Sequence, residues 1–204
     1  MYALVEDNSI SKIITNPKAM VIGDVRYPAK IFQLWSVSEL NAIGIFQVIT
    51  DSTNKKDEAY YINTNEQFDY ANNQVTRSWG TATPKRLEDE DAVDENGDPV
   101  LDDDGNQIIN YGLKTEKKRI VKQQASGLLE KTDWHNHKAL DDDTYTIPNN
   151  IKTYRAEVRA KSNEMESQID ACTNVDELKA LYEYTRQEDG TTTRPLAEFP
   201  KEVI

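Results

Sequence analysis

A run of acidic residues near the middle of the chain limits the possible folds more than any other feature. From Glu88 to Asp104 the sequence holds ten carboxylates and no basic residue. Such a segment cannot enter an apolar core, because an unpaired carboxylate loses far more hydration energy on burial than it regains. We therefore expect an exposed acidic element over residues 87–112. The segments expected around it are residues 1–86, residues 113–186 and an extended tail at 187–204.

The acidic run contains a near-repeat, in which DENGDPVL is followed by DDDGNQII. Each copy places Gly directly after Asn or Asp, a dipeptide typical of tight hairpin turns. A calcium-binding loop is the alternative, but it needs Gly at position 6 and Glu at position 12. Counted from Asp94 these positions hold Pro99 and Gly105, so an acidic hairpin arm is favoured. Its candidate surface residues are Asp94, Asp98, Asp102, Asp103 and Asp104.

Residues 1–86 are rich in β-branched and aromatic side chains and predict a small β-rich domain. One short helix is expected within it, because Ser36 and Glu39 have the spacing of a capping box and Gly44 suits a helix end. The expected apolar face of that helix consists of Val37, Leu40 and Ile43. The segments expected to be strands are YALV and ISKIIT around a polar turn, KIFQLW, IFQVI, EAYYIN, QFDYAN and NQVTRSWG.

From Leu113 onwards the spacing of apolar residues is helical. A first helix is expected to Lys131, a second to begin at Pro148, which suits a first helical turn, and a third, shorter one to follow Asn174 and its capping partner Glu177. The sequence thus predicts a helical hairpin with an additional short helix, and an α+β fold overall. The expected stripe of the second helix is Ile151, Tyr154, Val158, Met165 and Ile169, and the expected solvent face of the first is Lys114, Lys117, Lys118, Arg119 and Lys122.

The composition disfavours several classes of function. A formal net charge of −12 argues against binding to nucleic acid, whose phosphates require clustered Lys and Arg. No apolar stretch approaches the roughly 18 residues of a membrane-spanning helix. The first residues, MYALVEDNSI, lack the basic and apolar regions of a secretory signal. We therefore expect neither nucleic acid nor a membrane as partner, and we expect synthesis and residence in a cytoplasm.

Residues that could support catalysis or metal binding are few. His135 and His137 could chelate a metal ion together with Asp133 or Asp141. Zinc sites use three or four ligands, usually with paired Cys or His at both ends, and only one such pair exists here. Cys172, the single cysteine, has no histidine near it in sequence, which disfavours a Cys–His dyad, and it cannot form an intrachain disulfide. We expect no catalytic residue, no metal and no cofactor.

Trp134 lies just after the end of the first long helix, in a segment expected to be a polar connector. We expect its indole to fold back over Leu128 and Leu129 and to anchor the two long helices together, with both histidines on the solvent side. Asp133 is expected near the end of the first helix, where it either pairs with Arg155 or caps the connector. The alternative is an exposed Trp134 that contacts a partner protein.

The chain contains SGLLEKTDW, then a polar connector, and then IPNNIKTYRAEVR. This order of segments resembles the C-terminal region of bacteriophage tail proteins and tail-fibre assembly chaperones. The segments GDVRYPAKIFQLWSVSELNAIGIFQV and DENGDPVLDDDGNQ resemble further parts of the same proteins. The positions that carry the C-terminal motif are Leu128, Leu129, Thr132, Asp133, Trp134, Pro148, Tyr154 and Arg155.

The resemblance implies a non-enzymatic structural or adaptor protein of the virion tail, made in the cytoplasm of a host bacterium. Its implied partners are other tail, tail-fibre or baseplate proteins, and it would be present in multiple copies. We expect the acidic arm to meet a basic surface of a partner. The alternative function is a tail-fibre assembly chaperone that is absent from the mature particle. A third class, a cell-wall hydrolase, would require a carboxylate or Cys–His set that converges in a cleft.

Overall fold

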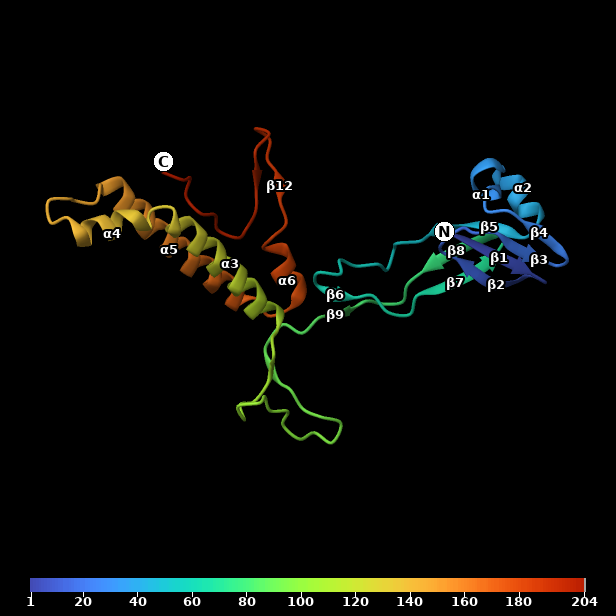
Figure 1. Ribbon diagram of the computed structural model, residues 1–204, viewed down its shortest axis with the longest axis horizontal. Coiled ribbons are helices and arrows are strands. Elements are labelled where there is room, and N and C mark those ends of the chain that lie inside the picture. The colour runs from blue at the N-terminus through green and yellow to red at the C-terminus, as the bar shows by residue number, and fades with distance from the viewer. Residues whose placement is uncertain (204) are drawn as a thin grey trace. The chain divides into compact units, whose positions relative to one another are not determined.

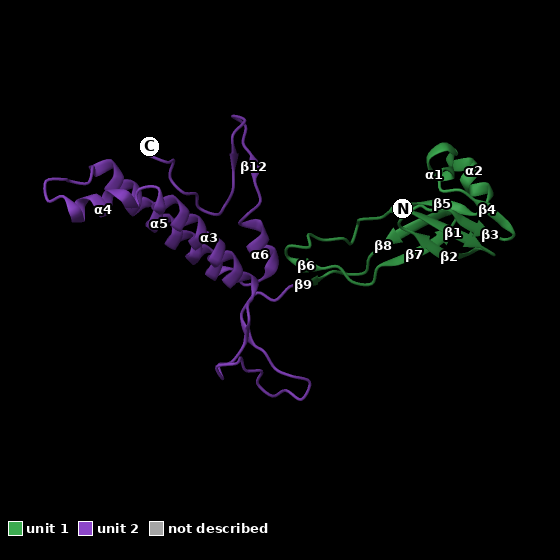
Figure 2. Ribbon diagram, viewed as in Figure 1, with its two compact units in different colours: residues 1–84 green, residues 85–204 purple. Residues whose placement is uncertain are grey.

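The computed structural model describes residues 1–203 and divides into two compact units, Met1–Pro84 and Lys85–Ile204 (Figure 2). Strands predominate in the first unit and helices in the second, which confirms the predicted α+β class (Figure 1). The first unit contains β1 (Tyr2–Glu6), β2 (Ser9–Ile14), β3 (Met20–Ile22), β4 (Val25–Tyr27), α1 (Ile31–Leu34), α2 (Val37–Ala42), β5 (Ile45–Thr50), β6 (Tyr61–Ile62), β7 (Gln67–Ala71), β8 (Gln74–Ser78) and β9 (Thr83–Pro84). The second contains β10 (Glu90–Asp91), β11 (Ile109–Asn110), α3 (Leu113–Glu130), α4 (Asp133–Asp141), α5 (Asn149–Ala171), α6 (Val175–Ala180), β12 (Thr185–Arg186) and β13 (Thr192–Thr193).

Five strands of the first unit form one sheet in the order β2-β1-β5-β8-β7. Neighbouring strands are antiparallel except β5 and β8, which run parallel. The outermost strands β2 and β7 approach each other, so the sheet curls. The predicted β1–β2 hairpin is confirmed, and its turn residues Asp7 and Asn8 both have positive φ, as a tight hairpin turn requires. Within EAYYIN the strand is limited to Tyr61–Ile62, which pairs with β9 outside the main sheet.

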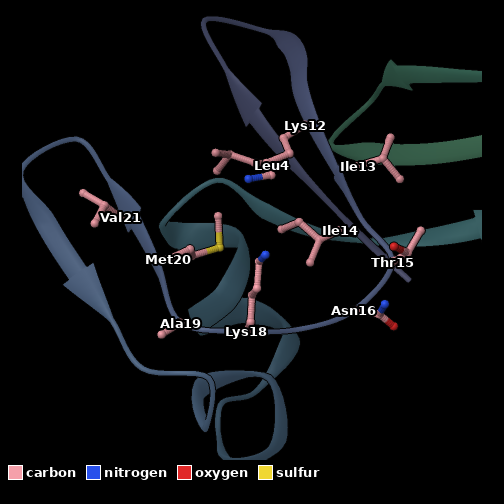
Figure 3. Close-up of a pocket in the computed structure, with 10 residues that line it drawn as sticks. All are labelled: Leu4, Lys12, Ile13, Ile14, Thr15, Asn16, Lys18, Ala19, Met20 and Val21. Atoms are coloured by element: carbon pink, nitrogen blue, oxygen red, sulfur yellow. The ribbon is translucent and has the colours of Figure 1, made fainter.

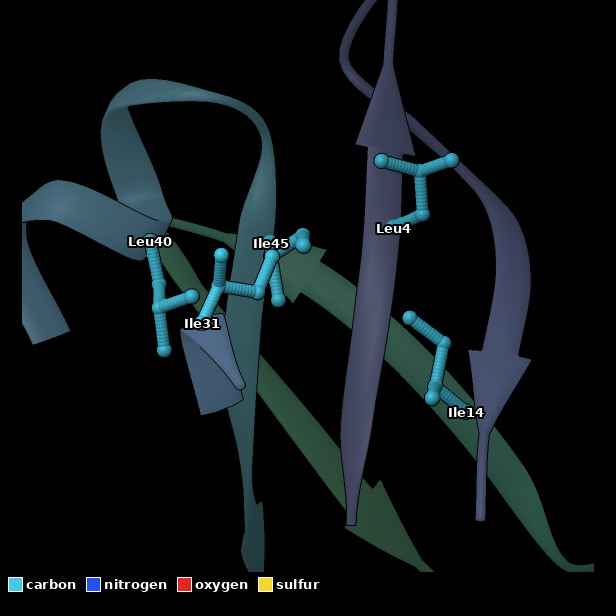
Figure 4. Packing of buried hydrophobic residues seen from close by; sticks show 5 residues of the cluster. All are labelled: Leu4, Ile14, Ile31, Leu40 and Ile45. Carbon is cyan, nitrogen blue, oxygen red and sulfur yellow. The ribbon is translucent and has the colours of Figure 1, made fainter. Parts of the chain in front are cut away.

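Both faces of this sheet are apolar, because successive residues of a strand point to opposite faces. In β1, Leu4 belongs to one core, and its two neighbours belong to the other. The first core consists of Leu4, Ile14, Ile31, Leu40 and Ile45, so that α1 and α2 each contribute one side chain to it (Figure 4). The second core consists of Ala3, Val5, Phe46 and Val75.

The expectation that KIFQLW forms a strand is wrong. Residues Ile31–Leu34 form α1, so the unit holds two short helices rather than one. An apolar run of six residues fits both the two-residue period of a strand and the 3.6-residue period of a helix. In the structure Ile31, Phe32 and Trp35 pack against the first core from one face of a helix. The first turn opens at Pro28, whose carbonyl accepts the N–H of Ile31.

The second short helix, α2, has the predicted signals at both ends. Ser36 Oγ accepts the N–H of Glu39 at 3.3 Å, and the Glu39 carboxylate accepts the N–H of Ser36 at 2.8 Å, which completes the capping box. Gly44 follows with a φ of +81°, a left-handed conformation that favours glycine. Of the expected apolar face, Leu40 is buried, but Val37 is exposed.

In the second unit the long helices α3 and α5 pack side by side (Figure 1). The stripe predicted on α5 is confirmed, since all five of its residues are buried. On α3 the buried apolar residues are Val121 and Ala125. Pro148 precedes α5 as its N-cap rather than lying in its first turn. The shorter helix α6 begins as predicted, because Asn174 Oδ1 accepts the N–H of Glu177 at 2.9 Å.

The expectation of an extended C-terminal tail is wrong. After the β12–β13 hairpin the chain returns to the helices, where Leu196 is buried and Phe199 packs against the core shared by α3 and α5. The side chain of Gln168 holds the backbone on both sides of Leu196. Its amide nitrogen donates to the carbonyl of Pro195 at 3.0 Å, and its oxygen accepts the N–H of Ala197 at 2.8 Å.

Candidate interaction sites

The residues of the C-terminal motif meet where α3 ends and α4 begins. Arg155 of α5 is buried there, and its Nη1 donates to the carbonyl of Leu129 at 2.8 Å and to Thr132 Oγ1 at 2.6 Å. Its Nη2 forms an ion pair with Asp133 Oδ1 at 2.8 Å, which confirms the predicted pairing. The last carbonyls of a helix have no partner within that helix. The guanidinium supplies one and fixes the bend between α3 and α4.

The expectation that Trp134 is a buried anchor is wrong. The segment expected to be a polar connector forms α4, and Trp134 in its first turn is 54% exposed. The residue that packs inward is His135, whose Nδ1 is hydrogen-bonded to the hydroxyl of Tyr145. The indole of Trp134 stacks on the His135 ring with the ring centroids 3.7 Å apart. Trp134 is therefore held in place on one side and open to solvent on the other.

Helix α4 also separates the two histidines. Residues two positions apart on a helix do not face each other, and here His135 is buried while His137 is exposed. Within residues 1–203 no group of three or more His, Cys, Asp or Glu side chains is arranged to hold a metal ion. Cys172 is buried, and its thiol donates to the carbonyl of Gln168 at 3.4 Å. Burial raises the pKa of the Cys172 thiol, which disfavours the reactive thiolate.

The remaining motif residues support the helix pair. Tyr154 is buried between α3 and α5, and Leu128 and Leu129 are partly buried against it. The hydroxyl of Tyr154 has no hydrogen-bond partner in the described part of the chain, and burial raises its pKa. The buried residues of the motif thus hold α4 in place against α3 and α5, and Trp134 is a motif residue that is exposed.

The acidic arm is fastened to the first turn of α3. Asp89 Oδ1 accepts the N–H of Gly112, the N-cap of α3, at 2.8 Å. Lys114, expected on the solvent face, is only 9% exposed, because its Nζ pairs with Glu88 and donates to the carbonyl of Asp170 at 3.0 Å. Carboxylates at a helix N-terminus interact favourably with the free N–H groups and the helix dipole. The arm therefore has a fixed base.

Each half of the acidic repeat forms the same turn. Asp94 Oδ1 accepts the N–H groups of Asn96 and Asp98, at 2.8 and 3.0 Å. Asp102 repeats this geometry eight residues later. These backbone hydrogen bonds hold the pKa of both carboxyls below the usual value for aspartate. Both aspartates therefore organise the backbone of the arm.

The arm is more elaborate than the predicted hairpin. The N–H of Ala92 donates to the carbonyl of Ile108 at 2.8 Å, that of Val100 to Ala92 at 2.9 Å, and that of Ile108 to Val100 at 2.9 Å. Three segments spaced by eight residues thus form a closed ring of backbone hydrogen bonds beyond the β10–β11 ladder. Next to this ring, Val93 and Leu101 are exposed, one at each repeat.

A groove in the first unit lies along β2 and β3 and has a volume of about 410 Å³. Its apolar lining includes Leu4, Ile14 and Met20 (Figure 3). Lys12 and Lys18 also line it, and no carboxylate does. Figure 3 shows the Lys18 side chain directed between Ile14 and Met20. The sequence contains no motif for this site, because the two lysines are brought together only by the connection between β2 and β3.

No helix among residues 1–203 is long and apolar enough to cross a membrane. Comparisons of the chain with protein families, with curated proteins and with solved structures found no match. The interaction sites are therefore interpreted from their own geometry and chemistry.

Proposed function

We propose that this chain is a non-enzymatic structural or adaptor protein of a bacteriophage tail, present there in multiple copies. It contacts other tail, tail-fibre or baseplate proteins. The phage context is supported by the resemblance of the C-terminal motif and of the acidic turn repeat. The observation that carries the contact function is the presentation of Trp134 on a rigid support.

Trp134 has the properties of a residue at the centre of a protein interface. Tryptophan is enriched among the residues that dominate binding energy, because its large ring displaces much water at a small cost in conformational entropy. Here the ring is already ordered by its stack on His135. Leu140, further along α4, is 80% exposed and adds apolar surface to the same helix.

The acidic arm supplies a second contact of a different kind. The side chains of Glu95, Asp103 and Asp104 project from folded turns into solvent. Charges of this kind raise the association rate with a basic surface and help to select the partner. Because the contact is exposed, it weakens with salt, as the Debye length falls to about 3 Å at 1 M.

Protein analysis of purified particles tests the proposal. We expect the chain in mature virions, at a fixed ratio to the known tail proteins. If it is absent from mature particles but bound to tail-fibre proteins before assembly, the chain is an assembly chaperone and the proposal is wrong. Absence from both would contradict both functions.

A variant experiment tests the observation that carries the proposal. Trp134→Ala should fold normally and fail to enter particles in a complementation assay, because it removes the largest exposed apolar side chain of α4. Tyr111→Ala is the matched control, since Tyr111 is an exposed aromatic residue of the same unit that lies outside α4. Normal incorporation of Trp134→Ala would rule out this face as the contact.

A further inference from the structure

We propose that the groove along β2 and β3 receives the acidic arm of a second copy of this chain. This inference rests on the proposed function, since it names one partner of a protein present in multiple copies. The groove and the arm belong to different units of the chain and have complementary chemistry.

The groove is suited to a ligand that is both apolar and anionic. Leu4, Ile14 and Met20 give it an apolar wall. Lys12 and Lys18 place two ammonium groups at that wall, and neither forms an ion pair within the described residues (Figure 3). An apolar side chain flanked by carboxylates would bury the wall and neutralise both lysines.

The arm presents this combination at its second turn. Leu101 is 54% exposed, although it is a large apolar residue. Asp103 and Asp104 follow within three residues and make no ion pair in the described chain, whereas Asp102 is occupied by the backbone of the turn. The first turn repeats the pattern with Val93 and Glu95. The closed ring of backbone hydrogen bonds fixes both turns before binding, which lowers the entropic cost of association.

The distribution of charge favours contact between an arm and a groove over contact between two arms. Residues 1–84 contain nine acidic and seven basic residues, whereas residues 85–204 contain 27 acidic and 17 basic ones. A two-fold contact between arms would place like charges opposite each other, which is unfavourable. Contact between the arm of one copy and the groove of another leads either to a closed dimer, in which two copies exchange arms, or to a ring or filament.

Complementation between two variants tests the proposal. One variant carries Lys12→Glu and Lys18→Glu and keeps its arm, and the other carries Asp103→Lys and Asp104→Lys and keeps its groove. At low ionic strength we expect the wild-type chain to self-associate in analytical ultracentrifugation. Each variant alone should associate at least about tenfold more weakly, as expected from losing two ion pairs. An equimolar mixture should recover association, because the intact arm of one variant meets the intact groove of the other and the two reversed surfaces are also opposite in charge.

The matched control carries Arg26→Glu and Lys30→Glu, which make the same charge change in the first unit outside the groove lining. It should self-associate like the wild type. Circular dichroism of each variant establishes that it is folded. A wild-type chain that stays monomeric, a mixture that forms no complex, or a control that is as weak as the groove variant would each overturn the proposal. None of these results would affect the detection of the chain in virions, so failure of the inference is distinguishable from failure of the proposed function.

Discussion

In the first unit a single curled sheet carries an apolar core on each face, whereas in the second unit the apolar core runs along the seam between two long helices and the segments that cover it. The second unit also has buried or partly buried polar side chains at its ends. Arg155 fixes the α3–α4 bend, Lys114 fixes the base of the arm, and Gln168 fixes the returning tail. Apolar burial therefore stabilises both units, and in the second unit directional polar contacts also define where its helices bend and where its arm and tail attach.

The largest effect is expected from a core substitution in the first unit. Ile45 is 0% exposed, so Ile45→Ala should lower the free energy of unfolding of this unit by about 2–5 kcal/mol. Hydrogen exchange measured on peptides from each unit shows whether the loss of stability is confined to the first unit. Ile49→Ala is the matched control, because Ile49 lies in the same strand but is 51% exposed. Equal losses for the two variants would show that burial does not govern this unit.

Arg155→Ala should have the next largest effect, confined to the second unit. It removes hydrogen bonds from a charged donor to Leu129, Thr132 and Asp133, each typically worth about 1.5–3 kcal/mol, and Asp133 recovers part of the loss from solvent. We expect a loss of about 2–3 kcal/mol, measured as faster exchange at the end of α3.

Arg159→Ala is the control for this substitution, because Arg159 lies one turn further along α5 and is exposed. It should change the exchange rates little. If Arg155→Ala left the end of α3 as well protected as before, the bend would not depend on polar contacts and the comparison between the units would fail.

In α4 we expect substitution of His135 to destabilise the protein more than substitution of Trp134, which is the opposite of the order expected from the sequence. His135→Ala removes a buried ring and its bond to Tyr145, at a cost of about 1–2 kcal/mol. Trp134→Ala removes a stacked but half-exposed ring, at a cost of about 1 kcal/mol or less. Thermal unfolding of both variants and of His137→Ala, which should be neutral, checks this order. A Trp134→Ala variant less stable than His135→Ala would restore Trp134 as the anchor.

The smallest effect concerns pH and the two turns of the arm. In the folded arm the pKa of Asp94 and Asp102 is lowered by hydrogen bonds from backbone N–H groups. The ionised form therefore stabilises the turns above the ordinary aspartate pKa of about 3.9, and this stabilisation is lost as the pH falls through the lower folded pKa. Amide NMR shifts of Asn96 and Asp98 should follow this titration while the first unit is unchanged. Shifts that begin well above pH 4 would show that the carboxyls of Asp94 and Asp102 do not have a lowered pKa.

Long or strongly marked patterns were predictable from the sequence. The α5 stripe extends over five turns, so no other periodicity fits it, and the capping box of α2 depends on two residues three positions apart. The ion pair of Asp133 with Arg155 also follows from the order of the helices. In each case the determining interaction is local, or it lies between two elements with clear periodicity.

Short and mixed patterns were not predictable. KIFQLW is too short to distinguish a strand from a helix, and the segment Asp133–Asp141 has no apolar stripe to indicate that it is helical. The exposure of Trp134 follows from that helix. The packing of the tail had a weak signal in the spacing of Leu196 and Phe199, but the tail looked extended because Thr, Pro and Gly are frequent in it.

The returning tail has a consequence for how the chain is synthesised. Because translation runs from the N-terminus, α3 and α5 leave the ribosome before Leu196 and Phe199 emerge to cover their shared flank. At about 5–20 residues per second, the 28 residues from Cys172 to Phe199 follow over roughly 1–6 s. During that interval the apolar side chains around Ala125 and Val158 are open to any protein nearby. The order of translation thus leaves a short period in which a chaperone or a neighbouring nascent copy can occupy the place of the tail.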